Sequence, residues 1–139
     1  MTDQQILDEV LRLLQTDPGT SSVVWFGGQY SPVQPQQYPW GLVYEPEEGT
    51  TAERAVRAFP DTVTDRLQVR VEWYTRAETL GQAERDAREI RERVRAVLWA
   101  SRVMAPNVVL LSVGGGLSAN PEASPPTARG WLVLTYERY

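Results

Sequence analysis

The clearest pattern of hydrophobic and polar positions lies between residues 66 and 101. Its first part alternates apolar with mostly polar side chains, the apolar ones being Leu67, Val69, Val71 and Trp73. An alternation with period 2 predicts a β-strand with one buried face and one more polar face. We therefore expect a long strand at the start of this region.

A long helix is predicted directly after this strand. Thr79 and Gln82 have the spacing of a capping box, in which side chains bond to the backbone at a helix start. The helix would bury one apolar stripe, formed by Ala83, Ala87, Ile90, Val94, Val97 and Leu98. Opposite charges spaced four residues apart predict an exposed opposite face, with the pairs Glu84/Arg88, Arg85/Glu89, Arg88/Glu92 and Glu89/Arg93. Since residues 107–113 are again strand-like, we expect a right-handed β-α-β crossover.

The rest of the chain predicts a second helix and several short strands. Residues 3–15 form the helix, with a capping box of Thr2 and Gln5, an end at residues 17–19, and an apolar stripe of Ile6, Leu7, Val10, Leu13 and Leu14. Strands are expected at residues 22–26, 41–45, 107–113 and 131–136. One or two helical turns are expected within residues 51–59, and non-regular structure at residues 29–40 and 46–49.

The connection between the last two strands is predicted to be a long loop. Residues 114–130 contain three consecutive glycines, an Asn-Pro pair and a Pro-Pro pair. A connection of about 17 residues exceeds ordinary hairpin loops, and loops of that length are typically functional or disordered.

These elements together predict an α+β fold in a single domain, residues 1–139. The sheet would be small and mostly antiparallel, with about four to five strands packed by two helices and a β-α-β-β C-terminal half. The strands at 108–113 and 131–136 are apolar on both faces. A sheet face that its own helices leave uncovered must meet another surface, so these strands predict association between chains.

Composition narrows the chemistry that the chain can perform. It contains no Cys, His or Lys, so all 14 positively charged side chains are arginines. Zinc and most transition-metal sites lose their usual ligands, and thiol nucleophiles, imidazole bases and Schiff-base lysines are excluded. We therefore expect no enzyme activity, no cofactor and no metal.

Charge and hydropathy narrow the classes of partner that the chain is expected to bind. No apolar run is long enough to span a bilayer, which predicts no membrane partner. The first five residues lack the basic and apolar segments of a secretory signal, so cytoplasmic synthesis is expected. A net charge of −4 argues against broad attraction to DNA phosphates.

Several groups of residues resemble functional motifs, and each has a simpler interpretation. The glycines at 114–116 suggest a phosphate cradle, but a Pro-rich segment rather than a helix follows them. Glu45, Glu47 and Glu48 offer oxygen ligands, although three carboxylates in a turn are usually solvated. The arginines of the long helix suggest a basic strip for nucleic acid, but the acids between them favour a solvated, salt-bridged face. The five tryptophans suggest protein–protein contact, but core packing is the main interpretation, with Trp25, Trp73 and Trp131 in strand patterns and Trp40 and Trp99 at element edges.

The order of elements resembles the tail-terminator (tail-completion) proteins of long-tailed bacteriophages. The resemblance is carried by the segments Val23-Val24-Trp25-Phe26-Gly27-Gly28 and Thr64-Asp65-Arg66-Leu67-Gln68-Val69-Arg70-Val71-Glu72-Trp73-Tyr74. The Ala83/Ala87/Ile90/Val94/Leu98 helix and the last strand pair with its long connection complete it. It covers most of the chain as a pattern of elements, with no catalytic or ligand motif to transfer.

The resemblance implies a structural protein of the virion tail, assembled in the host cytoplasm. Its copies would form a ring, typically a hexamer, that caps the tail tube, ends tube polymerisation and joins the tail to head-completion or neck proteins. DNA would pass only as cargo, without specific nucleic-acid binding. We expect contact between copies through Val109, Leu111, Leu132, Leu134 and Tyr136. Docking on the tube or neck is expected through loop residues Leu117, Ser118, Asn120, Glu122 and Arg129.

Three other functions stay open from the sequence. A head–tail joining (neck) protein has nearly the same features. A ferredoxin-like module for ligand binding or regulation fits the β-α-β-β order as well. A carboxylate-based hydrolase would need paired acids in one pocket, and no spacing in the chain predicts such a pair.

Overall fold

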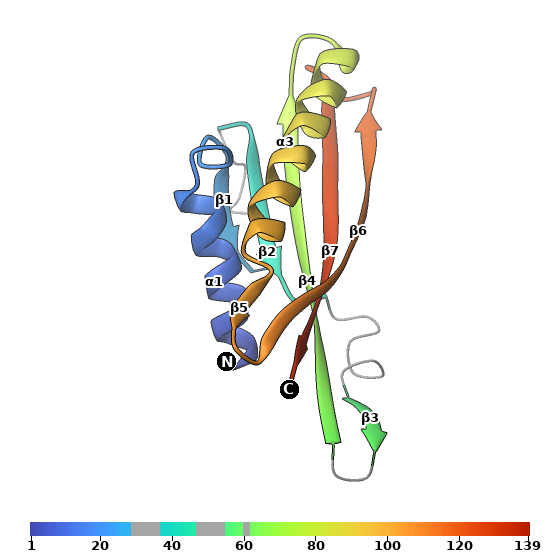
Figure 1. Ribbon diagram of the computed structural model, residues 1–139. Helices are drawn as coiled ribbons and strands as arrows, with labels where there is room; N and C mark the ends of the chain where they lie inside the picture. Colours follow the sequence, from blue (N-terminus) through green and yellow to red (C-terminus); the bar gives the residue numbers. More distant parts are fainter. Residues whose placement is uncertain (29–36, 47–54, 60–61) are drawn as a thin grey trace.

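The computed structural model describes residues 1–28, 37–46, 55–59 and 62–139, with the backbone alone described for residues 55–59 and 62–64. It contains two helices, α1 (Asp3–Thr16) and α3 (Leu80–Ala100). Its strands are β1 (Val24–Gly27), β2 (Trp40–Tyr44), β3 (Ala55–Phe59), β4 (Thr62–Arg76), β5 (Val103–Ala105), β6 (Val108–Asn120) and β7 (Thr127–Arg138). The expected α+β class is therefore confirmed (Figure 1).

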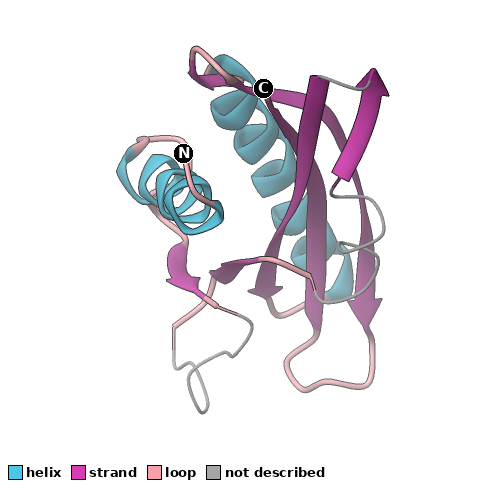
Figure 2. Cartoon of the chain, turned by 90° about the horizontal axis from the view of Figure 1, so that it is seen from below, coloured by secondary structure: helices cyan, strands magenta, loops and turns pink. Residues whose placement is uncertain are grey.

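All the strands belong to one sheet, in the order β1-β2-β4-β7-β6-β5, with β3 paired to the far end of β4. Only β1 and β2 run parallel, so the sheet is mostly antiparallel, as expected. The expected number of four to five strands was too low, because β3 and β5 were not foreseen as strands. Seen along the strands, the sheet curls around α3, and α1 lies beside that helix (Figure 2).

The predicted crossover is present, with one insertion. The chain passes from β4 through α3 to β6, but β7 lies between these two strands in the sheet. Because β7 is antiparallel to both, β4 and β6 run in the same direction. In the sequence, the C-terminal half also differs from a plain β-α-β-β unit, because the short strand β5 lies between α3 and β6.

The core lies between the sheet and the two helices. The four apolar positions that alternate along β4 are buried, as is the predicted stripe of α3 apart from the half-buried Val97. Trp73 is fully buried at the centre, where its indole Nε1 donates to the carbonyl of Ala87 at 2.9 Å. Gly130 lies opposite Trp73 on β7, and a Cβ there would be 2.4 Å from the indole ring. The glycine therefore makes the space that the tryptophan fills.

Both predicted helix starts are found, with one difference in detail. At α1 the reciprocal capping box of Thr2 and Gln5 is complete. At α3 the Thr79 hydroxyl accepts from the backbone N–H of Gln82, but the Gln82 side chain donates to Asp86 at 2.8 Å. Only the Thr79 half of the capping box is therefore present at α3.

Two predictions about local structure were wrong. The helical turns expected within residues 51–59 are absent from the described part of that segment, because residues 55–59 form β3 and pair with β4. Residues 51–54 lie outside the described part. Residues 29–36 and 47–49, which make up most of the segments expected to be non-regular, also lie outside the described part.

The long loop expected at residues 114–130 was also wrong, since β6 continues to Asn120 and β7 begins at Thr127. The glycines that suggested a loop allow close contact within the sheet instead. A Cβ at Gly115 would lie 2.1 Å from the carbonyl oxygen of Trp131, and one at Gly116 would lie 2.7 Å from its indole. Glycine in a strand interior often marks such an approach. Only residues 121–126 form the turn.

The fold predicts a sharp difference between two neighbouring positions of α3. Val94 is fully buried and Ala96 is exposed. Val94→Asp would bury an unpaired charge and should lower the free energy of unfolding by several kcal/mol, whereas Ala96→Asp should stay within about 0.5 kcal/mol of the parent. Urea denaturation followed by circular dichroism measures both. Equal stability of the two variants would show that the phase of α3 is wrong.

Candidate functional site

The expected contact residues on β7 are covered by the chain itself. Leu132, Leu134 and Tyr136 are 2%, 0% and 0% exposed and belong to the core cluster with both helices. This corrects the expectation that they face a neighbouring copy. The sequence shows that β7 is apolar on both faces, but it does not show which face the helices cover.

The expected contact residues on β6 lie nearer the surface. Val109 is half-buried, and Leu111 is 42% exposed at an irregularity between Leu110 and Ser112. The extra residue turns the Leu111 side chain out of the ladder. Two of the other large apolar side chains that are exposed lie on the same flank, Trp99 at 50% and Val103 at 60%.

A seam runs along this flank between α3 and β6. It contains a hollow of about 590 Å³ lined by Glu92, Arg95, Ala96, Trp99, Leu111, Ser112 and Val113. A second hollow of about 260 Å³ is lined by Glu84, Ala87, Arg88, Leu117, Ser118, Ala119 and Ala128. We call these two hollows the α3–β6 seam. Its apolar side chains come mostly from the strand, and its charged ones come from the helix and alternate in sign.

The strand that borders the seam has an open edge. β5 pairs with β6 only at Val108 and Val109, and the Leu110 N–H donates to the carbonyl of Arg102. After the irregularity at Leu111, β6 pairs with β7 from Ser112 to Asn120 on one side, and no strand of the described part of the chain pairs with it on the other. We call residues 111–120 the β6 edge.

Apart from the irregularity at Leu111, the β6 edge has little of the usual protection of a free strand within the described residues. Natural edge strands carry charges, prolines or covering elements that prevent pairing with another chain. Between Arg102 and Glu122 the sequence holds no charged residue, and its prolines lie outside the edge. An uncharged edge of this length beside exposed apolar side chains is a candidate interaction surface.

The residues expected to form one docking loop do not share a loop. Ser118 and Asn120 are exposed on β6, Leu117 points half-buried toward the core, and Glu122 lies in the turn. Arg129 belongs to β7, with its guanidinium carbon 5.0 Å from the ring centre of Trp131. The docking-loop prediction is therefore corrected to a long hairpin with a short turn.

The sheet face away from the helices holds a charged cluster that sequence reasoning missed. Glu72 is only 5% exposed, and its carboxylate accepts hydrogen bonds from the hydroxyls of Tyr44 and Tyr74, the latter at 2.8 Å. Arg70 forms an ion pair with it at 2.7 Å. The only sequence signal was that a Glu occupied a polar position between an Arg and a Tyr.

The surroundings of Glu72 shift several pKa values. Burial raises the pKa of Glu72, but the hydrogen bonds from Tyr44 and Tyr74 and the charges of Arg70 and Arg129 outweigh it, so the pKa lies below its ordinary value. Burial and the bond to Glu72 raise the pKa of Tyr44 and that of Tyr74 to about 12. The carboxylate is thus ionised and satisfied by its neighbours, which indicates a structural cluster.

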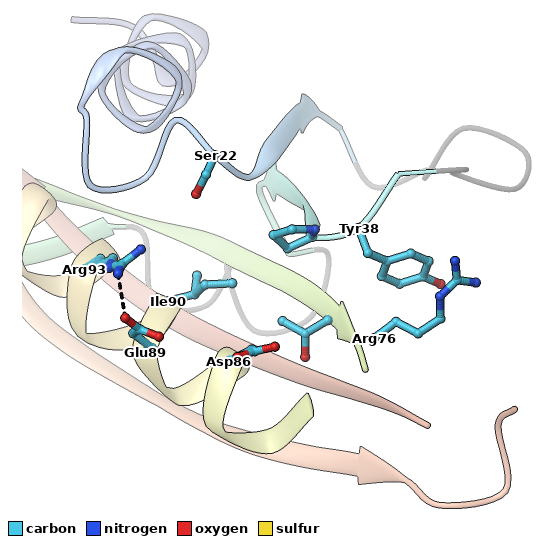
Figure 3. Close-up of a pocket in the computed structure, with 9 residues that line it drawn as sticks. Ser22, Tyr38, Arg76, Asp86, Glu89, Ile90 and Arg93 are labelled. Atoms are coloured by element: carbon cyan, nitrogen blue, oxygen red, sulfur yellow. Dashed lines mark hydrogen bonds and ion pairs between the residues drawn. The ribbon is translucent and has the colours of Figure 1, made fainter. Parts of the chain in front are cut away.

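A polar pocket of about 190 Å³ lies between α3 and the start of β2 (Figure 3). Glu89 and Arg93 form an ion pair at 2.5 Å on one side, the only one of the expected helix pairs that is recorded among the described residues. On the other side Arg76 lies over the ring of Tyr38 at 4.5 Å. Pockets for small ligands usually measure about 300–1,000 Å³. The small size of the pocket, and charged side chains that are already engaged with neighbouring side chains, favour a surface depression over a catalytic site.

Metal and membrane features were also sought in the described residues. No group of three or more acidic side chains gathers there as a metal site, and Glu47 and Glu48 of the carboxylate group noted in the sequence lie outside the described part. No helix in the same part of the chain is long and apolar enough to cross a membrane.

Comparison with known proteins leaves the family open. No protein-family model matches the chain, and no curated protein matches its sequence. Function is therefore inferred from the surfaces described above together with the resemblance in the order of elements.

The Glu72 cluster predicts a pH-dependent contribution to stability. Because the folded-state pKa lies below the ordinary 4.5, the ionised carboxylate stabilises the fold above that pH, and the contribution is lost as the pH falls through the folded-state value. Glu72→Gln should lower the free energy of unfolding by about 1–3 kcal/mol at pH 7 and by less at pH 3.

Urea denaturation at the two pH values measures this difference. Glu92→Gln is the matched control, because the Glu92 side chain is 67% exposed and should change stability little at either pH. An equal loss at pH 7 and pH 3 for Glu72→Gln would contradict the role of its charge.

Proposed function

We propose that the chain is a structural subunit of a bacteriophage tail, and that its copies form a ring on the end of the tail tube. The observation that carries the proposal is the uncharged β6 edge beside the α3–β6 seam. Such an edge in a soluble protein is normally covered, and here the cover has to come from outside the described part of the chain.

Energetics favour a protein partner for this surface. Each backbone hydrogen bond added along an edge contributes about 0.5–1.5 kcal/mol net. Leu111 and Trp99, at 42% and 50% exposed, would add apolar burial at about 25 cal/mol per Å². A small-molecule ligand uses few of these features, whereas an added strand and its side chains use all of them.

The particular role in the tail comes from the resemblance. The ring would end tube polymerisation and present a surface to head-completion or neck proteins, and DNA would pass through as cargo. The absence of Cys, His and Lys from the sequence agrees with a role in which assembly, rather than chemistry, is the function.

The proposal predicts a tail-length defect in particles made without this protein. Cells that carry the phage genome with the gene inactivated should produce overlong or headless tails, which electron microscopy measures directly. The wild-type gene supplied in trans should restore normal tails. A double variant with Trp99→Glu and Leu111→Glu should not restore them, because it places charges on the surface that the ring would bury.

Two controls accompany this experiment. Ser21→Glu alters an exposed serine away from the seam and should restore normal tails. The double variant should keep the circular dichroism spectrum and melting temperature of the parent, which shows that its failure is one of assembly. Normal tails in the absence of the gene would reject the proposed function.

A further inference from the structure

On the other side of the sheet, β3 has an edge with which no other strand of the described residues pairs. β4 pairs with β7 from Asp65 to Arg76, whereas its first three residues, 62–64, pair only with β3. The resulting hairpin projects past the end of β7 and away from both helices (Figure 1). A two-stranded hairpin is marginally stable in water by itself, so this one gains from a surface on which to pack.

The strand pairing fixes which side of the sheet this edge faces. Asp65 pairs with Ala55 of β3 and with Arg138 of β7, so β3 and β7 lie on opposite sides of β4. β3 therefore lies on the side where β2 pairs further along, and its outer edge faces away from β6. Among the described strands, β3 and β6 thus have unpaired edges that face in opposite directions.

We infer that β3 of one copy adds to the β6 edge of the next, so that the sheets of successive copies join head to tail. This rests on the proposed function in one respect, that copies of the chain assemble with one another. A contact between two different surfaces is heterologous, and such contacts form a ring when the rotation between copies closes and a filament when it does not. Pairing of β6 with itself would be two-fold and would end at a dimer.

The strand directions suit this pairing. β4 and β6 run in the same direction, and β3 is antiparallel to β4, so β3 is antiparallel to β6. In a ring, the strands of every copy have the same inclination to the ring axis, so β3 of one copy is also antiparallel to β6 of the next. Antiparallel pairs are slightly more stable than parallel pairs. β3 lies at the lower end of the sheet in Figure 1, whereas the free part of β6 lies above β5. If the strands are inclined to the ring axis, as they are in closed barrels, β3 of one copy lies at the same height as the free part of β6 in the next copy.

The chemistry of the two edges is compatible. Four of the five residues in the β3 sequence Ala55-Val56-Arg57-Ala58-Phe59 are apolar. The β6 edge has no charge, so the single arginine meets no like charge there. An added strand would also close the α3–β6 seam over Val113 and Leu117, which α3 leaves half-buried.

Disulfide trapping tests the contact, since the chain has no cysteine of its own. One copy carries a cysteine on the β6 edge, at the exposed positions Ser112, Ser118 or Asn120. The other carries Val56→Cys or Arg57→Cys, neighbouring positions that take opposite faces of a strand. The copies are expressed together in cells that assemble tails, and the lysate is oxidised mildly.

We expect a mixed disulfide between the two kinds of copy for at least one pairing of positions. With both cysteines on one chain, a ladder of covalent oligomers should appear. A disulfide that forms between two Ser118→Cys copies would mean two-fold pairing of β6 and would overturn the inference. A disulfide only to a tube subunit that carries its own cysteine would overturn it as well.

A charge on the edge provides the independent measurement. Ser118→Lys should reduce the oligomer that light scattering detects in the presence of tail tubes by at least tenfold, while Ser21→Lys should leave it unchanged. Oligomers that persist in Ser118→Lys and give no mixed disulfide would overturn the inference and leave the proposed function standing. A wild-type chain that stays monomeric with tubes present would reject both.

Discussion

The pairing of β4 with β7 is the interaction on which the rest of the structure depends. It joins Asp65–Arg76 to Thr127–Arg138 through twelve consecutive residue pairs, with Trp73 packed over Gly130 in the space that a side chain would otherwise occupy. The same tryptophan donates to the carbonyl of Ala87, and Thr75 donates to that of Ala83. These two bonds fix α3 over β4 and β7, and so leave the outer strand β6 incompletely covered.

Much of this arrangement could be predicted from local pattern. The period of two in β4 and the stripe of α3 are strong signals because each element buries a single face, and both were predicted correctly. β6 was predicted only in part, because its glycines have the composition of a loop. The reason for them, the nearby backbone and indole of Trp131, belongs to the neighbouring strand and is not visible in a local window. β3 was missed because pairing with β4, rather than a local pattern, makes it a strand.

The candidate surface was predictable to a similar extent. Leu111 was expected at a contact between copies and is exposed, whereas Leu134 was expected there and is buried in the chain's own core. Periodicity gives the two faces of a strand but cannot assign them to helix or solvent, and this assignment needs the tertiary fold. Glu72 could not be found by sequence because its burial and its partner Tyr44 depend on the pairing of β2 with β4 in space, although Arg70 lies two residues away on the same strand. The uncharged stretch between Arg102 and Glu122, by contrast, was present in the sequence and needed only the sheet order to give it meaning.

The position of β7 has a consequence for how the chain reaches its folded state. It is the last strand in the sequence, yet it lies between β4 and β6 in the sheet. During synthesis the earlier strands can form only two separate groups, β1-β2-β4 with β3 on one side and β6-β5 on the other, until β7 leaves the ribosome and joins them. Pairing of such distant segments is slow, and unpaired strands are prone to aggregation meanwhile. A chain without residues 127–138 would lose the strand that unites the two groups, so this deletion should direct the protein to chaperones and proteases.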